Sequence, residues 1–188
     1  MYGYRSNSFL CLLSAMAFFF SHNAFAEPTL MGRTVSLQVI TYDDPSHPAF
    51  SSATHTARVI EGIEFGLARQ GGQGDIDVVP LLVNIGANRI ELNYSVSNVA
   101  QGSFSTAIFN GYVLNFSTDC DLFGRAHINE DLTNLPLTND NISSGHGVLL
   151  VNVSGMQYTR QSRIVLNLDV NDCPIEGRGE SISSSKKD

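Results

Sequence analysis

Apolar and polar residues alternate along several separate segments of the chain, and this pattern constrains the fold more than any other feature. The alternation runs through residues 35–39, 90–96 and 164–170. A period of two places successive side chains on opposite faces of a β-strand, so that one face meets a core and the other meets water. Residues 109–116 and 148–153 are more apolar on both faces and predict two further strands.

The remaining patterns complete an all-β interpretation. Residues 78–85 carry Pro80, which cannot donate to a ladder, and this predicts an edge strand. The short stretch 86–88 that follows predicts a hairpin. Residues 55–67 fit a helical face as well as a strand, but their two glycines disfavour a helix, so we expect a strand. The chain therefore predicts an antiparallel β-sandwich of about 7–9 strands rather than a closed barrel.

Three segments are expected to be irregular. Residues 41–52 contain two prolines and predict a loop, and the glycine-rich residues 70–74 predict a turn. Residues 127–147 are long for a connection without structure of its own. This segment either contains a short strand or helix near residues 132–137 or is a functional loop.

The beginning of the chain has the order of charge, apolar run and small residues that the secretion machinery reads. Arg5 precedes the apolar residues 9–20, and Ala24–Ala26 is a small-x-small cleavage site. The apolar run is too short for an anchor, which needs about 20 residues. We therefore expect a signal peptide over 1–26, a single domain over 27–175, a disordered polar tail over 176–188, and no transmembrane anchor in the mature chain. The expected location is the periplasm or the extracellular space.

Export changes the cysteine count from an odd to an even number. Cys11 lies inside the leader, so the mature chain keeps Cys120 and Cys173, each just after a strong strand pattern. In an oxidising compartment two cysteines most simply form one disulfide. Closing a loop of roughly 50 residues stabilises the fold by about 4 kcal/mol at most. The alternative is two free or buried thiols.

Charge excludes one class of partner. Without Arg5, the mature chain has 10 basic and 18 acidic residues, a net charge of −8 with neutral histidines. Phosphate contacts need grouped lysines and arginines, so we expect no nucleic-acid partner.

Catalytic motifs are absent from the sequence. Ser154 is followed by glycine but lacks the first glycine of a hydrolase elbow, and the histidines are not at metal-binding spacings. One catalytic hypothesis remains, a small secreted hydrolase that takes its acids from Asp43 and Asp44 and a histidine, His127 or His146, from the long connection.

Three carboxylates gather around the expected disulfide. Asp119 and Asp121 flank Cys120, and Asp172 precedes Cys173. Loops rich in oxygen ligands bind Ca²⁺ when six or more ligands converge. We expect no cofactor, with a Ca²⁺ site at these residues as the alternative and solvated strand-end carboxylates as the simpler interpretation.

The leading functional hypothesis is a non-enzymatic binding or accessory module of the cell envelope or extracellular space. Its expected partner is an envelope polysaccharide or another exported protein. Aromatic residues expected in loops are the binding candidates, with core packing or strand-end anchoring as their alternative role: Tyr42, Phe50, Phe123 and Tyr158. A third hypothesis is an inhibitor of an exported enzyme, which would present one exposed, rigid loop.

Two motifs carry a resemblance to known proteins. The sequence FNGYVLNF at Phe109–Phe116, then LLVNVSGM at Leu149–Met156 and the strand pattern over 162–170, resembles an uncharacterised β-rich segment of secreted proteobacterial proteins. The resemblance covers roughly residues 105–170, although this chain carries no Pro-Glu-Pro motif. It implies export and β-structure and supplies no catalytic residue.

Overall fold

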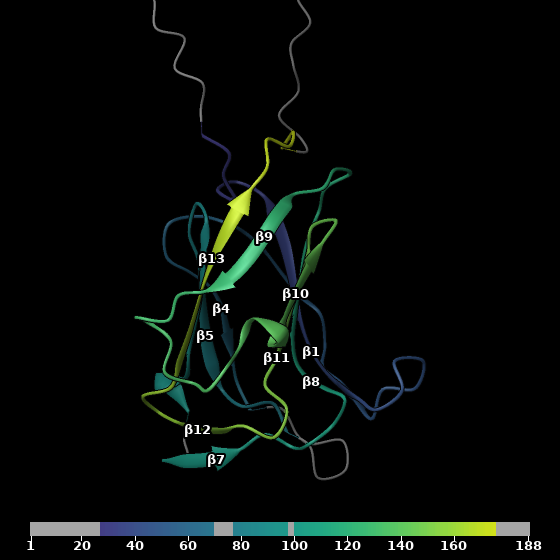
Figure 1. The fold of residues 1–188 in the computed structure, drawn as a ribbon, viewed down its shortest axis with the longest axis vertical. Helices are drawn as coiled ribbons and strands as arrows, with labels where there is room; N and C mark the ends of the chain where they lie inside the picture. Colours follow the sequence, from purple (N-terminus) through teal and green to yellow (C-terminus); the bar gives the residue numbers. More distant parts are fainter. Residues whose placement is uncertain (1–26, 70–76, 98–99, 176–188) are drawn as a thin grey trace, which may run out of the picture.

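The computed structural model describes residues 27–69, 77–97 and 100–175, which form two large sheets packed face to face (Figure 1). The first sheet has the strand order β10-β11-β8-β1-β2, and β3 also pairs with β1. Its strands are β1 (Thr34–Tyr42), β2 (Phe50–Ser51), β3 (His55–Arg58), β8 (Phe109–Phe116), β10 (Ile142–Gly145) and β11 (Val148–Asn152). The second sheet, in the order β4-β5-β6-β13-β9, consists of β4 (Ile63–Leu67), β5 (Leu81–Ile85), β6 (Arg89–Asn93), β9 (Phe123–Ile128) and β13 (Arg163–Val170). A small sheet of β7 (Gln101–Ser103) and β12 (Gln157–Thr159) lies at one end.

The predicted fold class is confirmed. Every strand pairing in the described ranges is antiparallel, and one core of buried side chains draws on both large sheets. These ranges contain thirteen strands, more than predicted, because β2, β3, β7, β10 and β12 are only two to four residues long. Strands so short show no detectable periodicity in the sequence.

The period-two segments supply the core. Leu37 of β1 and Leu114 of β8 lie opposite each other in register and are fully buried. Leu92 of β6 and Ile164 of β13 are paired in the same way in the second sheet and are also fully buried. Removing one such side chain from water contributes about 1.5–3 kcal/mol, so these four strands carry much of the stability.

The segment 55–67 is extended, as predicted, but it forms two strands rather than one. β3 pairs with β1 in the first sheet, whereas β4 pairs with β5 in the second. Between them the chain crosses from one sheet to the other through Gly62, whose φ of 122° favours glycine. The alternating pattern therefore predicted the conformation and missed the crossing.

Two details of the next segments differ from the prediction. β5 lies between β4 and β6, so it is not an edge strand; Pro80 precedes its first residue and removes no bond from the ladder. The hairpin from β5 to β6 is confirmed by the pairing of Ile85 with Ile90. β6 ends at Asn93, whose side chain accepts a hydrogen bond from the Ser95 N–H and caps a 3₁₀-helix, η1 (Tyr94–Val96).

The long connection after β9 completes the ladder of β13 where β9 has ended. The Asn129 N–H donates to the Val165 carbonyl, the Val165 N–H donates to Thr133 Oγ1, and the Arg163 N–H donates to Asn134 Oδ1. For Val165 and Arg163, a side-chain oxygen accepts the hydrogen bond that a carbonyl of a neighbouring strand would otherwise accept. The expected short element near residues 132–137 is therefore wrong in position. Regular structure appears later, as the 3₁₀-helix η2 (Asn139–Asn141) and β10.

The disulfide Cys120–Cys173 joins the ends of two strands that belong to different sheets. Cys120 follows β8 and Cys173 follows β13, and their Cα atoms are 6.1 Å apart. The bond therefore closes the sandwich across its two layers. We call this end of the sandwich, which holds the disulfide and the start of β1, the disulfide end.

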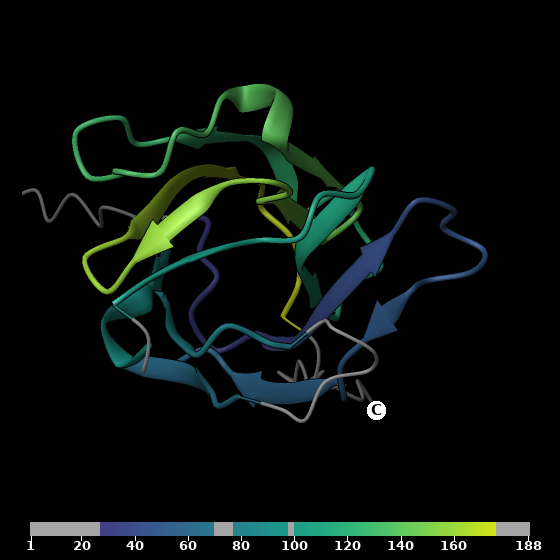
Figure 2. The same cartoon turned by 90° about the horizontal axis from the view of Figure 1, so that it is seen from below.

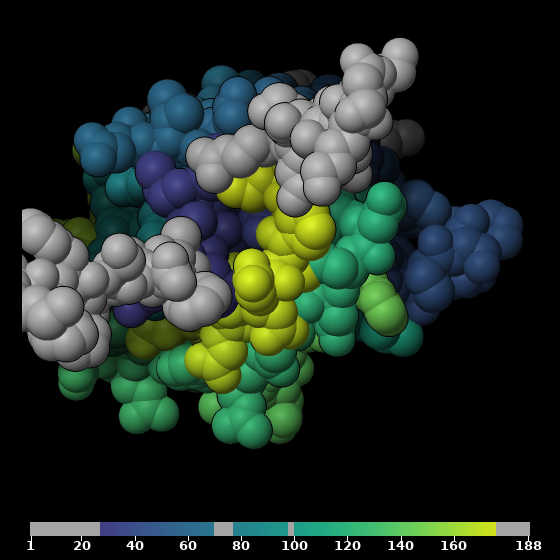
Figure 3. Space-filling view, turned by 90° about the horizontal axis from the view of Figure 1, so that it is seen from above, coloured from purple at the N-terminus to yellow at the C-terminus, as the bar shows by residue number. Residues whose placement is uncertain are grey.

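A buried arginine reinforces the disulfide end. Arg33 is 3% exposed, and its guanidinium donates to the carbonyls of Thr29, Cys173 and Pro174 at 2.9, 2.6 and 3.2 Å. Burial lowers the pKa of Arg33, and the nearby charge of Asp172 opposes that shift. Figure 3 shows the consequence, with the first and last described segments lying against each other on this face. The predicted leader and tail lie outside the described residues.

Candidate functional site

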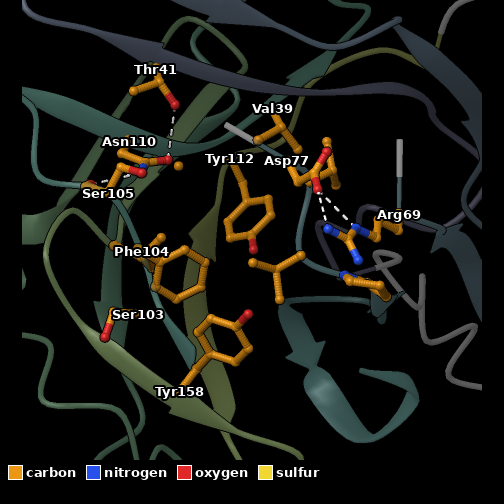
Figure 4. A pocket seen from close by; sticks show the side chains of 15 residues that line it. Val39, Thr41, Arg69, Asp77, Ser103, Phe104, Ser105, Asn110, Tyr112 and Tyr158 are labelled. Carbon is orange, nitrogen blue, oxygen red and sulfur yellow. Dashed lines mark hydrogen bonds and ion pairs between the residues drawn. The ribbon is translucent and has the colours of Figure 1, made fainter. Parts of the chain in front are cut away.

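A pocket of about 200 Å³ lies at the opposite end of the sandwich, which we call the pocket end (Figure 4). Its walls come from the C-terminal half of β1 and the first residues of β8. The segments that precede β5 and follow β7, together with strand β12, complete them. The lining residues are Val39, Thr41, Arg69, Asp77, Val78, Val79, Pro80, Ser103, Phe104, Ser105, Asn110, Gly111, Tyr112, Val153 and Tyr158.

Aromatic rings form one wall of the pocket. The ring centroids of Phe104 and Tyr158 are 4.8 Å apart, and Tyr158 also stacks on Tyr94 at 5.9 Å. Behind them the Tyr94 hydroxyl donates to the Tyr112 hydroxyl at 3.2 Å. Complete burial raises the pKa of both Tyr94 and Tyr112 above the ordinary value for tyrosine, so both hydroxyls stay protonated at neutral pH.

Pairing with a glycine places Tyr158 in this wall. Tyr158 of β12 lies opposite Gly102 of β7, and its ring extends across the space that a side chain at residue 102 would occupy. An aromatic ring over a cross-strand glycine shields the exposed backbone. Burial raises the pKa of Tyr158, and the charge of Arg69 opposes the shift.

Asn110 organises the polar wall. Its Oδ1 accepts a hydrogen bond from Thr41 Oγ1 at 3.0 Å, and its Nδ2 donates to the Ser105 carbonyl at 2.8 Å. These bonds hold the segment after β7 against β1 and β8. Ser103 and Ser105 are also among the lining residues; both are exposed, and neither hydroxyl has a hydrogen-bond partner among the described residues.

An ion pair lies on the remaining side. Asp77 Oδ2 accepts from Arg69 Nη2 at 2.6 Å and from Nε at 2.8 Å. The other carboxylate oxygen, Asp77 Oδ1, is buried and has no partner in the described part of the chain. Buried polar atoms in native proteins nearly always have a partner, so an unpaired one indicates a place for a water or ligand donor.

The two motifs that carry the sequence resemblance are neighbours in the structure and build the polar side of the pocket. Gly111 of β8 pairs with Asn152 of β11, and a Cβ at residue 111 would overlap the Val151 carbonyl. The Asn152 side chain accepts from the Asn110 N–H at 3.1 Å, and the Val153 N–H donates to the Asn110 carbonyl at 2.8 Å. These contacts give a physical reason for an Asn-Gly pair in one strand and an asparagine in the next.

All four aromatic candidates lie in strands rather than in loops, and the structure places one of them in the pocket. Tyr158 lines the pocket and, being 8% exposed, also packs in the core. Phe50 and Phe123 are each only 3% exposed and belong to the core, so core packing describes them and the prediction of a binding surface at these two residues is corrected. Tyr42 is partly exposed and stacks on Phe109, with ring centroids 5.3 Å apart, away from the pocket lining.

The three candidate calcium ligands lie near the disulfide and are all exposed. Asp121 Oδ1 accepts from the backbone N–H of His146 at 3.2 Å, and Asp172 lies near Arg33. Within the described ranges, no group of three or more histidine, cysteine, aspartate or glutamate side chains is arranged to hold a metal ion. Calcium binding at Asp119, Asp121 and Asp172 stays a prediction without structural support.

The residues of the hydrolase hypothesis make contacts of other kinds. Asp43 Oδ1 accepts from the Ile108 N–H, and Asp44 accepts from His47 Nδ1 at 3.0 Å and from the Ser46 N–H. The hydrogen bond from His47 lowers the pKa of Asp44. His127 lies on β9 with a buried Nδ1 that has no partner among the described residues.

Two further contacts bear on that hypothesis. The contact of His146 with Asp121 uses its backbone, so it does not involve the imidazole. Ser154 Oγ donates to the Ala107 carbonyl and accepts from the Ala107 N–H, which makes it a clamp between two turns.

No family model, curated protein or solved structure matches this chain. In the described ranges, no helix is long and apolar enough to span a membrane. The geometry of the pocket is therefore the basis for inferring what it binds. Sequence reasoning found Tyr158 but missed Arg69, Asp77 and the Ser103–Ser105 segment, because these residues belong to segments that meet only in the folded chain.

Proposed function

We propose that this protein is an exported, non-enzymatic binding module that recognises a component of the cell envelope at the pocket end. The observation that carries the proposal is a pocket lined by Phe104 and Tyr158 on one side and by hydroxyls and the Asp77 carboxylate on the others. Ligand sites in proteins combine such apolar surface with a few placed polar groups. The leader, read from the sequence, supports export to the envelope.

The positions of the two ends support the same proposal. The first described residues and the end of β13 meet at the disulfide end, whereas β7 and β12 lie at the other (Figure 1). A partner can therefore approach the pocket without meeting the first or the last described residues. The partner we favour is an envelope polysaccharide, because the lining offers hydroxyls and aromatic rings rather than a broad apolar face.

Binding rather than catalysis fits the chemistry of the lining. The pocket lining includes serines and an aspartate but no histidine or lysine. General base activation of a serine requires such a group within hydrogen-bond reach. Asp77 is held by Arg69 instead, and its second carboxylate oxygen can accept hydrogen bonds.

The test is capture of envelope components by the immobilised mature chain, compared between two matched variants. Ser105→Trp fills the pocket with a large side chain, whereas Ser117→Trp places the same residue at an exposed position after β8, at the disulfide end. We expect the first variant to lose capture of polysaccharide and the second to keep it. Equal capture by both variants, or none by the wild type, would contradict the proposal.

One observation favours a second candidate, an inhibitor of an exported enzyme. Residues 43–49 are exposed and project from the body of the molecule (Figure 2). The contact of Asp43 with Ile108 and the pair of Asp44 with His47 brace this loop. Such a loop could enter an enzyme cleft. The Asp44→Asn variant separates the candidates, since it should impair inhibition and leave polysaccharide capture unchanged.

A further inference from the structure

We propose that the pocket holds one uncharged, polyhydroxylated six-membered ring, the terminal unit of a neutral polysaccharide. This inference rests on the proposed binding function and specifies its ligand. It combines the size of the pocket, the pairing of apolar and hydroxyl surfaces, and the balance of charge at Asp77 and Arg69.

The volume restricts the ligand to a single ring. The pocket measures about 200 Å³. An apolar cavity of about 150 Å³ accommodates benzene, and drug-sized ligands occupy about 300–1,000 Å³. One six-membered ring with hydroxyl substituents therefore fits, and two linked rings do not. A site that takes one ring recognises the end or a side branch of a chain rather than its middle.

The lining matches the two surfaces of a sugar ring. A pyranose has an apolar face of C–H groups and an edge of hydroxyls. The rings of Phe104 and Tyr158 offer the apolar wall. The exposed serines Ser103 and Ser105 border the pocket, and a serine hydroxyl can both donate and accept, as a hydroxyl ligand requires. An aliphatic ligand of the same size would shield these serines from water without replacing their hydrogen bonds.

Charge disfavours an acidic ring. Among the described residues, two charged side chains line the pocket, Arg69 and Asp77, and they neutralise each other. An acidic sugar would have to break this pair, and it would approach a chain that carries 18 acidic and 11 basic residues. Conversely, Asp77 Oδ1 has no partner among the described residues and can accept from a ligand hydroxyl. The pocket therefore favours an uncharged ligand that donates a hydrogen bond to Asp77.

Titration calorimetry of the mature chain with small sugars tests this inference. The probes are methyl glycosides of neutral hexoses, glucosamine, glucuronic acid, and neutral oligosaccharides of increasing length. We expect at least one neutral hexoside to bind, glucuronic acid to bind at least tenfold more weakly, and the matching oligosaccharide to gain no more than about threefold. An affinity that rises steeply with chain length, or a preference for glucuronic acid, would overturn the inference.

Two variants of the ion pair make the charge argument separately testable. Asp77→Asn leaves the positive charge of Arg69 unpaired, so the affinity for glucuronic acid should rise relative to that for the neutral hexoside. Arg69→Gln leaves the negative charge of Asp77 unpaired, so the relative affinity for glucosamine should rise instead. Glu91→Gln removes the charge of another ion-paired carboxylate, which lies outside the pocket lining, and should change neither preference. If neither pocket variant shifts the preference, the assigned role of the pair is wrong.

Failure of this inference can be told from failure of the proposed function. If no sugar probe binds while Ser105→Trp still abolishes envelope capture, the binding function stands and the ligand class is wrong. If envelope capture is itself insensitive to Ser105→Trp, the function is wrong as well. Tyr158→Phe and Tyr158→Ala refine the result: loss of the hydroxyl should weaken sugar binding a few-fold, and loss of the ring should abolish it.

Discussion

At the disulfide end a covalent bond and a buried guanidinium tie the chain together, whereas at the pocket end the strands diverge around a hollow of about 200 Å³. The donors of Arg33 are used by three carbonyls of the chain itself. At the pocket end, three polar groups have no hydrogen-bond partner among the described residues: the hydroxyls of Ser103 and Ser105 and the Asp77 Oδ1 atom.

The difference suggests separate roles for the two ends: stability at the disulfide end and, on the proposed function, recognition at the pocket end. Polar groups that are satisfied within the chain contribute to stability, and those left over are available to a ligand. Changes at the disulfide end should therefore lower the free energy of unfolding and leave binding intact. Changes at the pocket end should do the reverse.

Loss of the disulfide should have the largest effect on stability. We expect Cys120→Ser and Cys173→Ser to lower the free energy of unfolding similarly, by about 2–4 kcal/mol, since the bond restricts the unfolded chain. The double variant should be no worse than either single variant. Urea denaturation measures the change, and thiol titration of the denatured, unreduced chain should find no free thiol. Two thiols per chain would refute the disulfide.

Loss of the Arg33 contacts should be the next largest effect. Arg33→Met keeps the buried stem but leaves carbonyls of Thr29 and Cys173 without their donor, and we expect a loss of about 2 kcal/mol. Arg58→Met is the control, because Arg58 is exposed and makes one hydrogen bond, to the Gly32 carbonyl. Denaturant midpoints that fall equally in both variants would contradict the role of Arg33.

Alkaline pH should weaken the core beneath the pocket. The unfolded chain releases the protons of Tyr94 and Tyr112 near pH 10.0, whereas burial raises both folded pKa values above it. Their contribution is therefore fully present below pH 10.0 and is lost as pH rises, by about 1 kcal/mol per pH unit for each tyrosine. Urea denaturation at several alkaline pH values should show this slope, and the Tyr94→Phe/Tyr112→Phe variant should flatten it.

Filling the pocket should have the smallest effect on stability. Ser105 is exposed, so Ser105→Trp should change the free energy of unfolding by less than about 0.5 kcal/mol, as is usual for surface substitutions. Thermal denaturation of this variant beside Ser117→Trp measures the change. A loss of several kcal/mol would show that the pocket end contributes to stability in the same way as the disulfide end.

The sequence predicts the disulfide end of the molecule better than the pocket end. The period-two strands β1, β6 and β13, the more apolar strand β8 and the pairing of Cys120 with Cys173 follow from local patterns and from the even number of cysteines left after export. The pocket depends on contacts between distant residues, such as Thr41 with Asn110 and Tyr158 with Gly102. No local period encodes these contacts, so the sequence predicted one lining residue and placed Phe50 and Phe123 on a binding surface although they belong to the core.

The most direct test of the account is to locate the ligand by NMR. Amide spectra of the mature, labelled chain would be recorded with and without soluble envelope polysaccharide. If the polysaccharide binds in the pocket, the amide signals of Gly102, Ser105 and Asn110 at the pocket end should shift. The amide signals of Asp121 and Gly147 near the disulfide should stay unchanged. Shifts confined to the disulfide end, or an unchanged spectrum at saturating polysaccharide, would contradict the assignment of recognition to the pocket.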